Sequence, residues 1–227
     1  MPKLVSAVVD VTLPSGVQKV YKDVEDEFIS EWEGGSIVAA NSASAGVKCR
    51  QIANGAVYDT SGDWKELHDE KLRALDDLLE EIGSHPVLVL YEFEHDKERI
   101  LQENSGMEVL GSGISATRLD SIVDRFNAGQ LPRLLGHPAS MGHGLNLQGT
   151  CHHIVWFGIP WNFEYYDQAI RRIYRQGQTS ETVFVYHIAA ERTLDQVVLK
   201  ELQRKEGEER NLKSAISSYR QEQLEGA

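Results

Sequence analysis

The chain has 227 residues, a formal net charge of −12, 41% hydrophobic residues and two cysteines. These values exclude a disulfide framework and argue against a nonspecific nucleic-acid coat protein, although a groove for phosphates needs only local positive charge. Because no apolar run could span a bilayer and the N-terminus lacks a signal-peptide pattern, we expect a cytoplasmic protein without membrane contact.

The first 62 residues predict an N-terminal extension made of one strand and two helices. Apolar residues first alternate weakly and then recur at helical spacing, as at Val17, Val20 and Val24. The predicted elements are a strand at 4–12 and helices at about 17–28 and 43–58. A polar turn at 59–63 separates them from the rest of the chain.

From Trp64 onward, helical and strand patterns alternate. The run from Val87 to Tyr91 is continuously apolar, which is typical of a strand buried on both faces of a parallel sheet. The predicted helices lie at 64–82, 95–104, 116–128 and 163–175, and the predicted strands lie at 87–91, 107–110, 132–136, 153–158 and 182–188. A charged helix from about 194 and a frayed tail complete residues 191–227.

This alternation predicts an α/β domain over residues 63–190, with a parallel sheet covered by helices on both faces. Ligands in such sheets usually bind outside the carboxyl ends of the strands. We therefore expect functional residues in the loops after Tyr91, Leu110, Gly136 and Gly158.

A pair of arginines carries the strongest functional signal. On a helix, Gln168, Arg172 and Arg175 lie at i, i+4 and i+7 and project from one face, and Gly177 follows where a helix cap is expected. Two guanidiniums without a neighbouring acid form a fork for phosphate oxygens, as a phosphoryl-transfer transition state requires. The same pattern is also compatible with a solvated basic helix face.

Two weaker patterns flank the arginine pair. Gly142 and Gly144 follow a predicted strand and would let backbone N–H groups approach a phosphate, although they also suit a tight turn. Asn162 is the predicted N-cap of the arginine-bearing helix. Cys151-His152-His153 suggests a metal site, but adjacent strand residues point to opposite faces, so we expect no metal there.

Together, these residues resemble motifs V and VI of the Swi/Snf-type ATPases of helicase superfamily two. The resemblance covers about residues 40–215 in the family's order, and the compact linkers resemble phage or bacterial members. Met141, His143 and Arg171 depart from the family pattern. The matching segments are Lys48–Asn54, Val87–Phe93 (motif IV), Gly111–Asn127, Gly142–Leu147 (motif V), Trp161-Asn162, Gln168–Gln178 (motif VI) and Thr193–Asp195.

The resemblance implies a second, RecA-like motor lobe of a DNA-stimulated ATPase that translocates on duplex DNA. The sequence contains neither a Gly-x4-Gly-Lys-Ser/Thr phosphate loop nor an acidic Mg²⁺ motif. ATP and Mg²⁺ would therefore be held mainly by the N-terminal lobe, with none expected on this chain. By itself the chain should turn over ATP negligibly.

The resemblance also implies residue roles. Arg172 and Arg175 would be arginine fingers, and Gln168 would set their geometry. The nucleotide cleft would be lined by Gly142, Gly144 and Asn146. The DNA backbone would be contacted by Ser112, Gly113, Ser140 and Trp161, although plain core packing is an equal alternative for Trp161.

Two other functions stay open from the sequence. The chain could be a non-catalytic RecA-like module that binds DNA or a partner protein. It could also be a small-molecule α/β enzyme that uses histidines such as His95 and His143, but no nucleophile-elbow motif supports that hypothesis.

Overall fold

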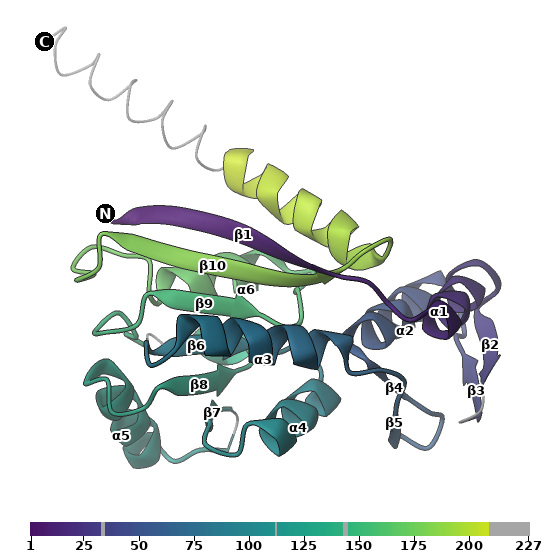
Figure 1. The fold of residues 1–227 in the computed structure, drawn as a ribbon, viewed down its shortest axis with the longest axis horizontal. Helices are drawn as coiled ribbons and strands as arrows, with labels where there is room; N and C mark the ends of the chain where they lie inside the picture. The colour runs from purple at the N-terminus through teal and green to yellow at the C-terminus, as the bar shows by residue number, and fades with distance from the viewer. Residues whose placement is uncertain (33–34, 112, 143–144, 209–227) are drawn as a thin grey trace, which may run out of the picture.

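A six-stranded, wholly parallel sheet forms the centre of the fold (Figure 1). The computed structural model describes residues 1–32, 35–111, 113–142 and 145–208. The strand order is β1-β10-β9-β6-β8-β7. The strands are β1 (Lys3–Val11), β6 (Val87–Leu90), β7 (Glu108–Leu110), β8 (Arg133–Gly136), β9 (His153–Trp156) and β10 (Thr182–Ala190). The predicted α/β fold with a parallel sheet is confirmed.

Helices cover both faces of the sheet, and the alternation along β6 shows why. Leu88 and Leu90 pack into one core cluster with α5 and α6, whereas Val87 and Val89 pack into another with α3 and α4. A C-terminal helix, described over 194–208, joins the first cluster. Within the described ranges, no helix is both long and apolar enough to cross a membrane. The covering helices are α3 (Glu70–Ile82), α4 (Glu94–Glu103), α5 (Ala116–Asn127) and α6 (Phe163–Arg171).

The N-terminal residues pack on this same lobe, which the sequence had left open. β1 pairs with β10 along its whole length, from Lys3 opposite Thr182 to Val11 opposite Ala190. After β1 come α1 (Ser15–Glu27), a hairpin of β2 (Ile29–Trp32) and β3 (Gly35–Val38), and α2 (Ser42–Asn54). The strand at 4–12 was therefore predicted correctly, whereas the β2–β3 hairpin was not predicted.

Two predicted helices are too long, because a second hairpin lies between them. Gly55 ends α2 with φ of 106°, and its N–H donates to the carbonyls of Gln51 and Ile52. The chain then forms β4 (Ala56–Tyr58), which pairs antiparallel with β5 (Trp64–Glu66). The predictions of helix up to residue 58 and from residue 64 are wrong at these ends.

A buried ammonium group ties four parts of the fold together. Lys71 of α3 is fully buried, and its Nζ lies 2.6 Å from Oδ2 of Asp195 in the first turn of the C-terminal helix. The same Nζ donates to Oδ1 of Asn54 in α2 at 2.8 Å and to the carbonyl of Phe157 after β9 at 3.2 Å. This arrangement satisfies all three N–H groups of the lysine and fixes α2 against the sheet.

We predict that Lys71→Ala lowers the free energy of unfolding by about 3–5 kcal/mol, because it leaves the buried carboxylate of Asp195 without its cation. Chemical denaturation measures this change. The exposed Lys200 provides a matched control, and Lys200→Ala should change stability by less than about 0.5 kcal/mol. Equal effects of the two substitutions would contradict the prediction.

A buried histidine on β10 makes stability depend on pH. Burial lowers the pKa of His187 to about 4, and its Nε2 lies 2.9 Å from the hydroxyl of Tyr166. Between pH 6.5 and about 4, the unfolded chain binds a proton that the folded chain excludes, so the folded state loses stability as the pH falls.

We predict that His187→Gln flattens this dependence, by up to about 1.4 kcal/mol per pH unit within that window. The measurement is urea denaturation at a series of pH values for the wild type and the variant. Parallel pH profiles for the two proteins would show that His187 does not contribute.

Candidate functional site: an arginine pair at one edge of the sheet

The arginine pair lies at the edge of the sheet where the strands begin, which we call the amino edge. α6 leaves the carboxyl end of β9 and runs back to Arg171, after which the chain reaches the start of β10. Arg172 and Arg175 therefore lie at the amino edge. The pair is thus not in the loops after the carboxyl ends of the strands, where functional residues were expected, because a crossover helix returns the chain to the opposite edge.

The pair is also not on a continuous helix. α6 ends at Arg171, and the carbonyl of Arg172 accepts from the N–H of Leu147 at 3.1 Å rather than continuing the helical ladder. Turns carry the chain onward, and Gly177, with φ of 90°, lies within the last of them instead of capping α6. Arg172 keeps right-handed helical torsions as the C-cap, so Gln168 and Arg172 still lie at i and i+4. The predicted shared helical face is wrong for Arg175, which follows the end of the helix. The Gln168 amide donates to Glu164 at 2.9 Å.

Arg172 joins the end of α6 to the loop between β8 and β9. Its Nε donates to the carbonyl of Met141 at 2.7 Å. Met141 lies in η1 (Pro138–Gly142), and both Met141 and Leu147 are buried in the core. The structure thus brings together the two segments that resemble motifs V and VI. The predicted residue Gly144, like His143, lies outside the described residues.

The two guanidiniums form a locally positive site. Burial and the neighbouring charge of Arg175 lower the pKa of Arg172. In the described part of the chain neither guanidinium forms an ion pair, whereas the adjacent Arg171 pairs with Asp167 at 2.5 Å. Arg175 is exposed and Arg172 half-buried. An anion reaching this edge would therefore meet two cations that no carboxylate neutralises.

Asn127 holds the same loop from the other side, and no role was predicted for it from the sequence. Its Nδ2 donates to the carbonyl of Asn146 at 2.7 Å, and its Oδ1 accepts from the N–H of Gly149 at 2.9 Å. Asn127 is the last residue of α5 and of the matching segment Gly111–Asn127, and that resemblance was the available signal. Asn146 is exposed and lies with Arg172 at the amino edge.

Of the residues expected to contact DNA, Gly113 and Trp161 lie at the carboxyl edge, whereas Ser140 adjoins Met141, whose carbonyl accepts from Arg172. Gly113 follows β7 and is exposed with φ of 85°, and Ser140 follows β8 within η1. Trp161 follows β9 and is 53% exposed, so the core-packing alternative for its side chain is wrong. Asn162 caps α6 as predicted, accepting from the N–H groups of Glu164 and Tyr165. Ser112 lies outside the described residues.

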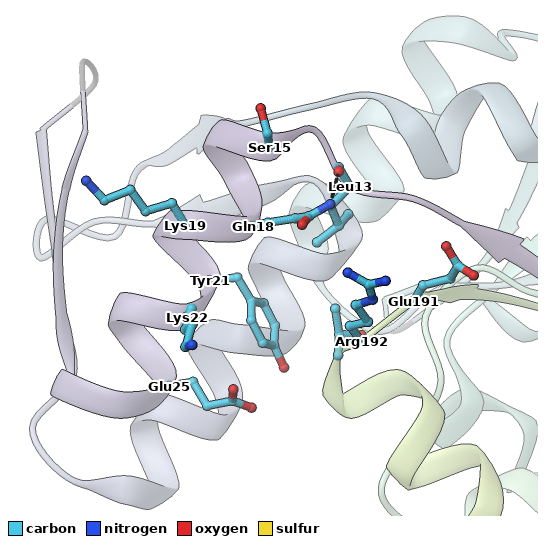
Figure 2. Close-up of a pocket in the computed structure, with 10 residues that line it drawn as sticks. Leu13, Ser15, Gln18, Lys19, Tyr21, Lys22, Glu25, Glu191 and Arg192 are labelled. Atoms are coloured by element: carbon cyan, nitrogen blue, oxygen red, sulfur yellow. Dashed lines mark hydrogen bonds between the residues drawn. The ribbon is translucent and has the colours of Figure 1, made fainter.

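A pocket of about 490 Å³ at the carboxyl ends of β1 and β10 was not predicted (Figure 2). It lies between α1 and the start of the C-terminal helix. Its charged lining is mixed, since Lys22 and Arg192 are accompanied by Glu25 and Glu191. Figure 2 shows that the Lys19 side chain extends away from Arg192. This mixture of charges gives the pocket no clear preference for an anion.

His152 and His153, at the start of β9, lie side by side and do not point to opposite faces as predicted. The rings of His152 and His153 lie 4.4 Å apart, and both contact His85, so adjacency did not separate them. The reason is that His152 precedes the first strand residue, His153. Even so, within the described ranges no group of three or more His, Cys, Asp or Glu side chains is arranged to hold a metal ion.

Comparison with known proteins adds family information to this geometry. Residues 70–177 match the model of the helicase conserved C-terminal domain. The chain is 39% identical over 214 residues to "Putative protein p41" of Acyrthosiphon pisum secondary endosymbiont phage 1, covering 92% of this chain and 44% of that protein. It is 34% identical over 106 residues to "Uncharacterized ATP-dependent helicase YqhH" of Bacillus subtilis (strain 168), covering 46% and 18%.

The chain therefore spans less than half the length of either relative. Among solved structures, it resembles the C-terminal part of the Fun30 ATPase domain with a TM-score of 0.66 and 14% identity, over 88% of this chain and 89% of that one. At this identity the likeness shows a common fold.

We predict that Gly177→Ala destabilises the segment after α6, because alanine is strained at φ of 90° and its Cβ would lie 3.0 Å from Nε2 of Gln148. The expected loss in the free energy of unfolding is about 1–2 kcal/mol. As a matched control, Gly16→Ala in α1 meets no atom within 4 Å and should be neutral or slightly stabilising. Thermal or urea denaturation compares the two variants, and a neutral Gly177→Ala would contradict the strain.

Proposed function

The chain contains a helicase conserved C-terminal domain and is the C-terminal lobe of a helicase-like protein, and on this premise we propose that it is the second motor lobe of a DNA-stimulated ATPase that translocates on duplex DNA. In this proposal ATP and Mg²⁺ are held mainly by an N-terminal lobe outside this chain. The chain supplies arginine fingers and contacts to the DNA backbone, and alone it has negligible ATPase activity.

One observation carries the proposal: two adjacent guanidiniums lie at the amino edge without an ion-pair partner among the described residues. A phosphoryl-transfer transition state spreads negative charge over the γ-phosphate oxygens, and cations placed there lower the barrier. The bond from Arg172 Nε to the Met141 carbonyl supports this role, because it leaves the terminal nitrogens of that guanidinium for phosphate.

The neighbouring residues have supporting roles in the proposal. Gln168 lies one turn before the arginine pair and helps to set its geometry through α6. Gly142, Gly144 and Asn146 line the nucleotide cleft, where backbone N–H groups could approach the triphosphate. The bonds from Asn127 support this assignment, because they fix the Asn146–Gly149 segment beside the arginines.

Ser112, Gly113, Ser140 and Trp161 contact the DNA backbone in this proposal. Gly113 and Trp161 then act at the carboxyl edge, whereas Ser140 lies beside Met141, to which Arg172 bonds, so the DNA and nucleotide contacts adjoin at η1. Closure of the two lobes around ATP moves this lobe relative to the other, hydrolysis releases it, and each cycle shifts the DNA contacts along the duplex.

We predict that Arg172→Ala or Arg175→Ala, in the chain joined to its N-terminal lobe, lowers DNA-stimulated ATP turnover by at least about 100-fold. Roughly 10³–10⁵ is the contribution of arginine fingers in GTPases. Steady-state ATPase assays measure turnover, and fluorescence anisotropy with a labelled duplex measures DNA affinity, which should change less than about threefold because neither arginine is among the proposed DNA contacts.

Arg171→Ala is the matched control, because Arg171 adjoins the pair but is already paired with Asp167. Its turnover should stay near that of the wild type. Unchanged turnover in both finger variants would remove the assignment. A nucleotide-independent loss of DNA affinity in Arg172→Ala would instead favour a non-catalytic DNA-binding module.

A further inference from the structure

A buried arginine on α2 stacks against the exposed indole of Trp161. The guanidinium carbon of Arg50 lies 5.6 Å from the centroid of the Trp161 ring. Arg50 is only 7% exposed, whereas Trp161 is 53% exposed. One side of the indole therefore contacts the Arg50 guanidinium, while much of its remaining surface is exposed to solvent at the carboxyl edge.

Three further contacts fix the Arg50 guanidinium. Its Nη2 lies 3.0 Å from Oε1 of Glu92, just after β6, and donates to the carbonyl of Ile159, just after β9, at 2.7 Å. The centroid of the Phe93 ring lies 5.5 Å from the guanidinium carbon of Arg50. A planar group held by two oxygens and two aromatic rings has little freedom to rotate, so it offers a stationary surface to the indole.

The backbone around Trp161 is fixed as well. Asn162 caps α6 through its side chain, and Ile159 is buried two residues earlier. With both flanks fixed, the side-chain torsions of Trp161 are the freedom that remains. Contact with Arg50 selects among those torsions, because only orientations that keep the indole against the guanidinium retain the cation–π attraction.

We propose that Arg50 is a positioning residue that holds the Trp161 indole in the orientation in which it contacts DNA. This inference rests on the proposed function, in which Trp161 is a DNA contact. It gives α2 a part in DNA binding, although no residue of α2 was expected at the DNA-binding edge. It also explains why Arg50 is buried with its charge paired, since an immobile guanidinium is what the indole requires.

Arg50→Lys tests the inference, because lysine keeps the positive charge for Glu92 but has no planar face for the indole. The first readout is the mobility of Trp161, measured by time-resolved fluorescence anisotropy of this chain. The signal of Trp161 among the four tryptophans is obtained by subtracting that of Trp161→Phe. We expect a larger fast depolarisation in Arg50→Lys and no change in the exposed-site control Arg73→Lys.

The second readout is the affinity of the chain for a fluorescein-labelled DNA duplex at low salt. We expect Arg50→Lys to weaken binding by about fivefold, in line with the loss of one cation–π contact and its orientation. In the Trp161→Ala background the same substitution should change affinity by less than about 1.5-fold, because residues acting through one contact are not additive. If Arg50→Lys does not fold, Glu92→Gln removes one anchor and replaces it in both assays.

The outcomes separate this inference from the proposed function. Unchanged mobility of Trp161 in Arg50→Lys overturns the positioning role, whatever happens to DNA binding. An equal loss of affinity in the presence and absence of Trp161 also overturns it. If Trp161 becomes mobile but Trp161→Ala binds DNA as the wild type does, the DNA contact of the proposed function fails, and the positioning role for DNA fails with it.

Discussion

The bonds that Arg172 makes to the β8–β9 loop determine the geometry of the candidate site. Its carbonyl accepts from Leu147 and its Nε donates to Met141, so the end of α6 is bound to that loop at two points. Both loop residues are buried in the sheet core, which transmits the rigidity of the sheet to the arginine pair. The helix ends at this point, and Arg175 lies in the turns that follow. Neither Arg175 nor Arg172 has a carboxylate partner among the described residues.

α6 links the two edges of the lobe. Its N-cap, Asn162, adjoins Trp161 at the carboxyl edge, and its last residue, Arg171, adjoins the arginine pair at the amino edge. A helix of nine residues is about 14 Å long. In the proposed function, a single short helix therefore separates Trp161 from the arginine pair, so a movement imposed at one end of α6 is carried directly to the other.

The sequence predicted what depends on local pattern and missed what depends on tertiary contact. The strand at Val87–Leu90 was predicted because burial on two faces requires a continuous apolar run. The cap at Asn162 was predicted because a capping residue stands directly before its helix. The end of α6 could not be predicted from the sequence, because the N–H that donates to the Arg172 carbonyl belongs to Leu147, in a loop distant along the chain. The contact of Arg50 with Trp161 joins residues 111 positions apart and has no local signature.

In the proposed function, this chain completes an ATPase whose nucleotide another lobe holds. The most direct measurement is DNA-stimulated ATP turnover by three samples: this chain alone, its N-terminal lobe alone, and the two mixed at rising concentrations of this chain. The account predicts negligible turnover by either lobe alone and a turnover in the mixture that rises and saturates. Hydrolysis by this chain alone at the rate of the mixture would contradict it.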